Sequence, residues 1–255
     1  MNDRPAFSII CVYNDRETLD EFLDTGLKNQ TCRNFEKIYI DNRDSTYESA
    51  SEALNEGAFK ASGKYLVFIH QDVRLTPRYL SYSLSYLDEI DNLGVAGAAG
   101  VRSTGNCRSE GVNLIHHGQE RKKWERGTHI ESPKEVDSLD ELILIVPKKV
   151  FEEERFSTSV CKGWHLYGVE YSIRMKKSGK KVVVLPLDLW HYSDGGWRDV
   201  RHDLTLLRII HQYPDLQCIH TTGGSWPAAR WYVALRILRK TLAGSLFKWP
   251  QRLAD

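Results

Sequence analysis

Three side chains that can act as ligands follow an apolar run early in the chain. Residues 65–69 read YLVFI and are predicted to form a buried strand, and His70, Gln71 and Asp72 come directly after it. An imidazole, an amide and a carboxylate placed in succession can bind a metal ion or a polar ligand. Polar residues also end strands simply because the backbone returns to water there. Taken alone, the stretch leaves both interpretations open.

Two other apolar runs end in polar side chains in the same manner. The predicted strand at residues 7–12 leads to Asn14, and the one at residues 38–40 leads to Asp41 and Asn42. In a parallel sheet, ligands bind at the carboxyl ends of the strands. Asp41 and Asn42 offer atoms that suit a nucleobase edge or ribose hydroxyls, although an Asx turn would use them too. Asn14 and the next residue, Asp15, fit a helix N-cap equally well.

The segments between these runs have helical spacing, so strands and helices alternate. Apolar residues recur at helical intervals over 19–27, and small residues do so over 50–61, where a helix could lie close against a sheet. A third helix is expected to begin at Thr76-Pro77, and residues 95–99 are predicted to form a fourth strand. This alternation predicts an α/β fold with a mainly parallel sheet covered by helices.

The regular alternation stops after residue 100. Residues 101–134 are rich in glycine, histidine and charge, and we expect an inserted hairpin or loop region there. The later elements are expected as strands at 142–146 and 181–185, helices at 166–178 and 203–213, and a polar loop at 187–196. We expect one domain and an extension, divided as 1–200 (a nucleotide-binding half at 1–100 and an acceptor half at 101–200) and 201–255.

The expected extension is helical and basic. Between residues 216 and 254 there are six basic residues and no acidic one. An apolar stripe at helical spacing is flanked by basic side chains, and these residues are Trp231, Leu235, Leu238 and Leu242, with Arg236, Arg239 and Lys240. Such a helix could pack on the core with its charges in water, or it could lie on an anionic membrane surface.

The bulk composition excludes several classes of protein. With 255 residues, 41% of them hydrophobic, the chain can bury a sizeable core, and its formal charge of +1 gives no bias toward nucleic acid. The five cysteines lack paired spacing, so we expect neither a zinc site nor a disulfide framework, and we infer a reducing compartment. The amino terminus predicts no signal peptide, and no transmembrane segment is expected.

Several stretches together resemble the family 2 glycosyltransferases. Their order and spacing carry the resemblance more than any single motif, and it spans residues 7 to about 197. The stretches are FSIICVYND, IYIDNRDSTYESASEALNEGAFKASGKYLVFIHQDV, LILIVPKKVFEEERF, GWHLYGVEYSIRMKKSGKKVVVLPL and WHYS. The resemblance implies a GT-A fold and inverting transfer of a sugar from a nucleotide sugar.

The resemblance also implies roles for individual residues. Val12, Tyr13 and Asn14, together with Asp41 and Asn42, would bind the nucleoside. Asp72 would be the last aspartate of the D-x-D motif and would hold Mn²⁺ or Mg²⁺, which neutralises the departing diphosphate. His191 would be a second metal ligand or a diphosphate contact. His70 replaces the first aspartate of the motif and, with Gln71, would lie against the nucleotide sugar.

The base that activates the acceptor departs from the family pattern. The acceptor helix usually begins with Glu-Asp, but those positions read Tyr167-Gly168, and Glu170 is the next acidic residue. Glu170 would be the general base, with His165 as its competitor, although an ion pair with Arg174 one helical turn later would explain Glu170 equally well. Further acceptor contacts could come from Asp140-Glu141.

The expected function is therefore metal-dependent transfer of a sugar from a nucleotide-diphosphate sugar to a hydroxyl of a glycan or lipid-linked acceptor. The protein is expected in the cytoplasm or at the inner face of the membrane. One alternative is a nucleotidyltransferase, but the residues after the first strand are neither glycine-rich nor basic. The other is an inactive module that binds sugar nucleotides, which the missing Glu-Asp pair favours.

Overall fold

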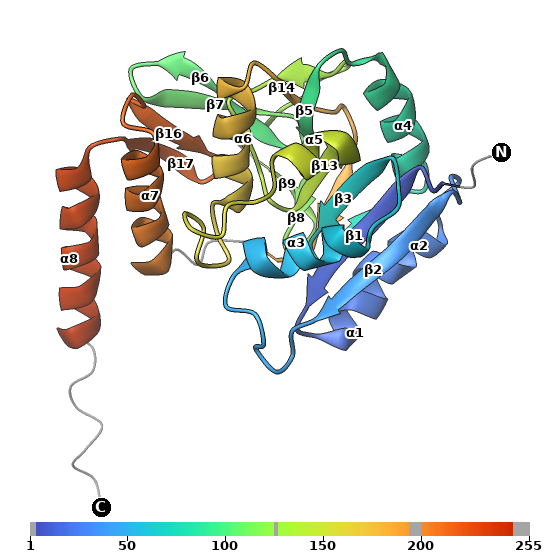
Figure 1. Cartoon of the computed structure of the whole chain (residues 1–255), viewed down its shortest axis with the longest axis horizontal. Coiled ribbons are helices and arrows are strands. Elements are labelled where there is room, and N and C mark those ends of the chain that lie inside the picture. The colour runs from blue at the N-terminus through green and yellow to red at the C-terminus, as the bar shows by residue number, and fades with distance from the viewer. Residues whose placement is uncertain (1–3, 125–126, 194–199, 247–255) are drawn as a thin grey trace, which may run out of the picture.

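A seven-stranded sheet forms the centre of the molecule in the computed structural model, which describes residues 4–124, 127–193 and 200–246 (Figure 1). The strands lie in the order β11-β14-β5-β13-β3-β1-β2. In that order their bounds are Lys134–Glu135, Lys181–Val184, Leu93–Gly97, Ile143–Pro147, Tyr65–Ile69, Phe7–Tyr13 and Phe35–Asp41.

Most strands of this sheet run in one direction. β1 is parallel to β2 and to β3, with Phe7 opposite both Phe35 and Tyr65. β13 is antiparallel to its neighbours β3 and β5, whereas β14 is parallel to β5 and β11 is antiparallel to β14. Only β13 and β11 therefore run against the other five strands, which confirms the predicted α/β fold with a mainly parallel sheet.

Helices cover both faces of the sheet because the strand residues alternate between two cores. One core joins Ile10 and Phe68 to α3 (Ala50–Lys60), α5 (Lys148–Glu153) and α6 (Tyr167–Lys177). The other joins Ile9 and Val67 to α4 (Tyr79–Glu89) and to a continuous helical segment. That segment comprises α1 (Arg16–Thr18), the π-helix η1 (Leu19–Asp24) and α2 (Thr25–Lys28). Adjacent strand residues point to opposite faces, which explains this division.

The small residues of α3 let it lie directly on the sheet. A Cβ atom added at Gly57 would lie 2.5 Å from Cγ2 of Ile10 in β1, well inside van der Waals contact. Ala53 and Ala58 of the same helix are buried. The close approach predicted from this stripe is therefore present, and it fixes α3 and the loop before it against the carboxyl ends of β1 and β2.

Two smaller sheets are built from the middle of the chain. One contains the expected hairpin, β6 (Gly100–Gly105) and β7 (Arg108–Val112), with β12 (Ser138–Leu139) and β10 (Gly127–Thr128). The other has the order β4-β15-β8-β9, with bounds Val73–Leu75, Leu189–His191, His116–His117 and Lys122–Lys123. The prediction of a polar loop at 187–196 is wrong for its first part. Residues of β15 pair with both β4 and β8 there, and Trp190 packs on Phe22.

The carboxyl-terminal part is more closely joined to the core than an appended extension would be. It contains α7 (Val200–Gln212), the hairpin of β16 (Cys218–Thr221) and β17 (Gly224–Pro227), and α8 (Arg230–Leu246). Leu206 and Ile209 of α7 are buried in the same core as Met175 of α6. The hairpin was not expected. Figure 1 shows α7 between α6 and the outermost helix, α8. None of the described helices is long and apolar enough to cross a membrane.

A disulfide corrects the expectation drawn from the cysteines. Cys107, in the turn between β6 and β7, is bonded to Cys218 of β16, with Cα atoms 5.5 Å apart. The two are 111 residues apart in sequence and meet only because the β16–β17 hairpin packs beside β6 and β7, so spacing could not reveal the pair. We inferred a reducing compartment, and with it a cytoplasmic location, from the absence of a disulfide framework. The disulfide removes the basis for both inferences. Cys11, Cys32 and Cys161 are free.

Candidate active site

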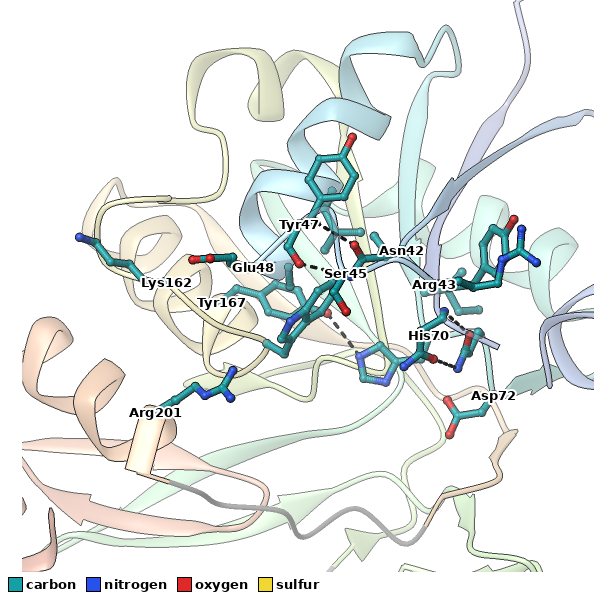
Figure 2. A pocket seen from close by; sticks show the side chains of 18 residues that line it. Asn42, Arg43, Ser45, Tyr47, Glu48, His70, Asp72, Lys162, Tyr167 and Arg201 are labelled. Atoms are coloured by element: carbon teal, nitrogen blue, oxygen red, sulfur yellow. Dashed lines mark hydrogen bonds between the residues drawn. The ribbon is translucent and has the colours of Figure 1, made fainter. Parts of the chain in front are cut away.

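A cavity of about 910 Å³ opens at the carboxyl ends of β1, β2 and β3. Val12, near the end of β1, lines it together with residues that follow the three strands, namely Asn14, Asn42, His70 and Asp72. Further lining residues come from the loop before α3, from the loop before α6 and from the start of α7. Figure 2 shows the side chains around this cavity. The site therefore lies at the edge of the sheet that the polar strand ends predicted.

His70, Asp72 and His191 form a cluster of ligand-type atoms beside this cavity. One ligand atom from each residue lies within 4.8 Å of the other two, which no other trio of His, Cys, Asp or Glu achieves among the described residues. His191 Nε2 lies 3.4 Å from Asp72 Oδ2, and the two imidazole rings are 5.6 Å apart between centroids. We call these three residues the His-Asp-His cluster.

Pairing of β4 with β15 brings the cluster together. His191 lies opposite Val73, so the residue that ends β15 meets the residue that precedes β4. The Tyr192 N–H donates to the Asp72 carbonyl at 2.9 Å, and the Ser193 N–H donates to Asp72 Oδ2 at 3.2 Å. Ser193 Oγ lies 3.0 Å from His191 Nε2. Backbone pairing thus fixes both side chains before any ligand is present.

The protonation states of the cluster favour metal binding. Burial would raise the pKa of Asp72, but the hydrogen bond and the charge of His191 hold it well below its ordinary value. Burial and the neighbouring His191 lower the pKa of His70. At neutral pH the cluster therefore offers a carboxylate and a neutral imidazole at His70, which are the forms that bind metals.

The donor set of the cluster fits a divalent transition ion. A carboxylate with two imidazoles suits Mn²⁺ better than Mg²⁺, which prefers oxygen ligands throughout. Three protein ligands leave coordination positions for phosphate oxygens and water. The sequence indicated Asp72 and His191 for this role and placed His70 with the nucleotide sugar. His70 could have been identified as a candidate metal ligand from the sequence, because its imidazole comes two residues before the Asp72 carboxylate at the end of a strand.

Gln71 joins the first and third strands. Its Oε1 accepts from the backbone N–H groups of Asn14 and Asp15 at 3.0 and 3.1 Å, and its Nε2 donates to Asn14 Oδ1 at 2.7 Å. Asp15, and not Asn14, caps α1. Asn14 and Gln71 both line the cavity and are hydrogen-bonded to each other. They therefore fix the shape of the site and also form part of the surface that a ligand would contact.

Asp41 and Asn42 are occupied by their own loop. Arg43 binds Asp41 through Nη2 at 2.6 Å from Oδ2 and Nε at 3.0 Å from Oδ1, which with the Tyr13 hydroxyl holds the pKa of Asp41 below its usual range. Asp41 does not line the cavity, whereas Asn42 does. The Asn42 amide closes the loop by accepting from Tyr47 N at 2.8 Å and donating to Tyr47 O at 3.3 Å. The Asx turn is made by Asp41, whose Oδ1 accepts from the Arg43 N–H at 3.0 Å, while the Asn42 amide spans a longer loop.

The structure does not support Glu170 as the base. Its side chain is 1% exposed and does not line the cavity. Its oxygens accept from the Tyr213 hydroxyl at 2.5 Å and from Arg174 Nη2 at 3.1 Å, and Arg174 also binds Glu154 at 2.7 Å. This buried network matches the ion-pair alternative. His165 is half-buried near His202, at 6.2 Å between ring centroids, and does not line the cavity either.

Glu141 lies against the first turn of α6, in the space that a side chain at position 168 would need. Its Oε1 accepts from the Gly168 N–H at 2.9 Å, and a Cβ at position 168 would lie 2.9 Å from Glu141 Cγ. Burial, with the charge of Asp140, raises the pKa of Glu141 to about 8. Glu141 does not line the cavity, so it serves as a cap for α6 supplied by a distant segment.

Apart from Tyr167 in α6 and Arg201 at the start of α7, the polar and aromatic lining residues that were missed lie on irregular loops. Such positions follow neither a strand period nor a helix period, so no pattern marked them. Tyr167 was considered only as a departure from the family, yet its hydroxyl lies 3.4 Å from His70 Nε2 and donates to the Glu141 carbonyl at 3.3 Å. The other missed residues are Arg43, Ser45, Tyr47, Glu48, Lys162, Trp164 and Arg201.

Comparison with known proteins gives matches of three kinds. The family model described as "Glycosyltransferase like family" matches residues 8–212. Streptomycin biosynthesis protein StrF of Streptomyces griseus is 25% identical over 194 residues, an alignment covering 71% of this chain and 66% of that protein. The chain thus spans slightly less than two thirds of this curated relative.

Two solved structures have a similar fold. GalNAc-T7 with UDP, GalNAc and Mn²⁺ has a TM-score of 0.59 at 11% identity, over 85% of this chain and 49% of that chain. Mannosyltransferase PcManGT from Pyrobaculum calidifontis, in complex with GDP-Man and Mn²⁺, has a TM-score of 0.56 at 13% identity, over 97% and 76%. Identities this low establish only the fold, which is GT-A-like. Because the family model covers residues 8–212, which contain the sheet and the cavity described above, the chain belongs to the glycosyltransferase-like family.

Proposed function

We propose that this protein transfers a sugar from a nucleotide-diphosphate sugar to an acceptor hydroxyl, with inversion and with a divalent metal ion. The observation that carries the proposal is the His-Asp-His cluster at the edge of a cavity of about 910 Å³, at the carboxyl ends of the parallel strands. The family membership and the GT-A-like fold support the same reaction. The two structural neighbours were solved with UDP or GDP-Man and with Mn²⁺, which supports Mn²⁺ here.

The chain supplies binding and orientation for this reaction. Val12, Tyr13 and Asn14 line the cavity where the nucleoside would lie, and Asn42 shapes the loop beside it. The His-Asp-His cluster would hold Mn²⁺, which when bound neutralises charge on the departing diphosphate. Tyr167, hydrogen-bonded at 3.4 Å to His70 Nε2, orients that imidazole. The acceptor oxygen would bond to the anomeric carbon as the bond to the diphosphate breaks on the opposite side.

For the acceptor we propose a glycan or lipid-linked hydroxyl, and α8 is the segment that would contact a membrane. Trp231 is 69% exposed and Leu238 53% exposed on this helix. Two of its basic residues point inward: Arg236 Nη2 lies 3.2 Å and Lys240 Nζ 2.7 Å from the buried Asp203 carboxylate. Membrane contact would therefore rest on the apolar stripe more than on charge. Leu242, the last member of that stripe, has a side chain outside the described part.

The proposed function is tested by titrating nucleoside diphosphates with and without Mn²⁺. We expect metal and nucleotide to tighten each other by the same factor. Asp72→Asn should abolish that coupling, whereas the control Asp91→Asn, an exposed aspartate away from the cavity, should retain it. Nucleotide affinity that does not respond to metal in the wild type would show that the cluster is not the centre of the reaction.

An inactive module that binds sugar nucleotides remains the second candidate. The burial of Glu170 favours it, because the helix expected to supply the base presents no carboxylate to the cavity. An inactive module would bind donor and metal without cleaving the donor. Release of nucleoside diphosphate from the donor, measured over hours at high protein concentration, separates the two functions.

A further inference from the structure

The cavity has a second wall, on the far side from the cluster. Three lining side chains from distant segments lie there (Figure 2), and Trp164 also lines the cavity from the loop that carries Lys162; we call the four the acceptor wall: Glu48, Lys162, Trp164 and Arg201. In Figure 2, Glu48, Lys162 and Arg201 lie on the opposite side of His70 from Asp72. If the diphosphate lies at Asp72, the acceptor must approach from the side of this wall, since displacement at the anomeric carbon is in line.

Glu48 lies on a loop whose backbone is held at both ends. Tyr47 N donates to Asn42 Oδ1 at 2.8 Å, and the Ser49 side chain caps α3 by accepting from Glu52 N at 3.3 Å. Next to it, Ala50 N donates to the Gly163 carbonyl at 3.1 Å, which joins this loop to the one that carries Lys162 and Trp164. Glu48 is therefore presented to the cavity by a fixed backbone.

Glu48 is the carboxylate that remains available to an acceptor. Within the described ranges, Glu48 and Asp72 are the acidic residues that line the cavity. Asp72 belongs to the His-Asp-His cluster, and Asp41, Glu141 and Glu170 are held by the contacts described above. Glu48 is exposed, and its side chain makes no hydrogen bond or ion pair within the part of the chain that the structure describes.

We propose that Glu48 is the general base of the transfer, acting on an acceptor bound against the acceptor wall; this rests on the proposed function. The Glu48 carboxylate takes the proton of the acceptor hydroxyl while its oxygen bonds to the anomeric carbon. The bond from that carbon to the diphosphate oxygen breaks, and its electron pair leaves with the nucleoside diphosphate. Catalysis of this kind typically contributes about 10²–10⁴-fold to the rate.

Trp164 indicates that this acceptor is a carbohydrate. Its side chain lines the cavity and is 36% exposed, so a ligand can reach part of the indole. The apolar C–H face of a sugar ring can pack on such a surface, with its hydroxyls directed to polar neighbours. Arg201 and Lys162 supply donors on the same wall, and in Figure 2 the guanidinium of Arg201 extends toward the cavity.

The test compares Glu48→Gln with Glu52→Gln, a matched exposed glutamate four residues away that does not line the cavity. The readout is release of nucleoside diphosphate from the donor, first with water as acceptor and then with a panel of p-nitrophenyl glycosides. We expect Glu48→Gln to lower kcat by about 10²–10⁴-fold. Its affinity for nucleoside diphosphate with Mn²⁺ should stay within about twofold, which also shows that the variant is folded. Glu52→Gln should behave as the wild type.

A chemical rescue adds an independent readout. Glu48→Ala supplemented with sodium formate should regain part of the lost rate, because a small carboxylate can occupy the vacated space, whereas Glu52→Ala should show no response. Donor cleavage by Glu48→Gln at the wild-type rate would overturn the assignment of Glu48 and leave the proposed function standing. Absence of any donor cleavage in the wild type would instead count against the proposed function itself.

Discussion

The imidazole of His191 lies 3.4 Å from the carboxylate of Asp72, and the strand pairing of β15 with β4 holds the two together. His70 completes the cluster from the end of β3. An ion bound here would have two nitrogen ligands and at least one oxygen ligand from the protein. The types of these ligand atoms therefore determine which divalent metal ion the cluster binds more tightly.

We expect Mn²⁺ to support tighter nucleoside diphosphate binding than Mg²⁺, because imidazole is a poor ligand for Mg²⁺. His191→Ala and His70→Ala should each reduce the ratio of the two affinities. Calorimetric titration with each metal measures it. His117→Ala, which changes an imidazole on the neighbouring strand β8, is the matched control. A ratio that is unchanged in both cluster variants would place the metal elsewhere.

Glu141 should make stability depend on pH. Its pKa of about 8 in the folded protein exceeds that of an ordinary glutamate, so folding favours the protonated form. This stability is fully present below the unfolded pKa and is lost as pH rises through about 8. In Glu141→Gln the neutral side chain can still accept from Gly168. Between pH 5 and pH 8 the wild type should therefore lose about 1–3 kcal/mol relative to the variant in urea unfolding. A constant difference over that range would show that Glu141 is not perturbed.

Glu170→Gln should affect stability more than chemistry. The change removes the charge that faces Arg174 in a buried network, and we expect a loss of about 1–3 kcal/mol in the free energy of unfolding. Turnover per folded molecule should stay within about threefold of the wild type. Urea unfolding and steady-state kinetics on the same preparation give both numbers. A selective loss of turnover at unchanged stability would return the role of base to Glu170.

Asp41→Asn should hardly change nucleotide affinity, because Arg43 and Tyr13 already bind the carboxylate. Asn42→Ala should weaken nucleotide binding by about tenfold or more, since the loss of one or two hydrogen bonds to Tyr47 releases the loop that borders the cavity. Titration of both variants with the same nucleoside diphosphate decides between them. The reverse order would identify Asp41 as the direct contact.

The Cys107–Cys218 disulfide should contribute substantially to stability. It joins residues 111 apart, and a disulfide typically stabilises a protein by about 2–4 kcal/mol, with long loops toward the upper end. Cys107→Ser, or reduction with dithiothreitol, should lower the free energy of unfolding by this amount, and Cys32→Ser should not. Mass determination after alkylation without reductant would count the protected cysteines. Five alkylated cysteines in the native protein would contradict the bond.

The sequence predicted those features that follow a regular period. The alternation of apolar runs and helical stripes in the first hundred residues gives the sheet, and the polar ends of β1, β2 and β3 mark its ligand-binding edge. The remainder depends on contacts between distant segments. Glu48 and Trp164 lie on loops whose sequences have no periodic pattern. Residues 189–191 form the strand β15 by pairing with β4. Cys218 is brought to Cys107 by a hairpin that no sequence pattern predicted.

Some of the expected site residues have partners that their own motif does not contain, so the sequence could not show how these side chains are held. Glu170 is acidic and lies on the expected helix, but the hydroxyl of Tyr213, from a later segment, donates a hydrogen bond to one of its carboxylate oxygens. Asp41 is the last residue of β2 instead of the first residue after it, and the neighbouring Arg43 binds it. In contrast, the structure brings Asp72 together with His191, the partner that the family resemblance implied, and their role in metal binding stays a prediction.

The pairing of β4 with β15 has a consequence for folding. The cluster combines a strand end from the first third of the chain with a strand from its last third, so it cannot form until most of the polypeptide has been synthesised and folded. An ion bound to Asp72 and His191 would act as a non-covalent cross-link between these segments. Because the unfolded chain holds the ligands far apart, such an ion would raise the midpoint of thermal unfolding in proportion to the logarithm of its concentration. Manganese would then report the completion of folding as well as serving the reaction.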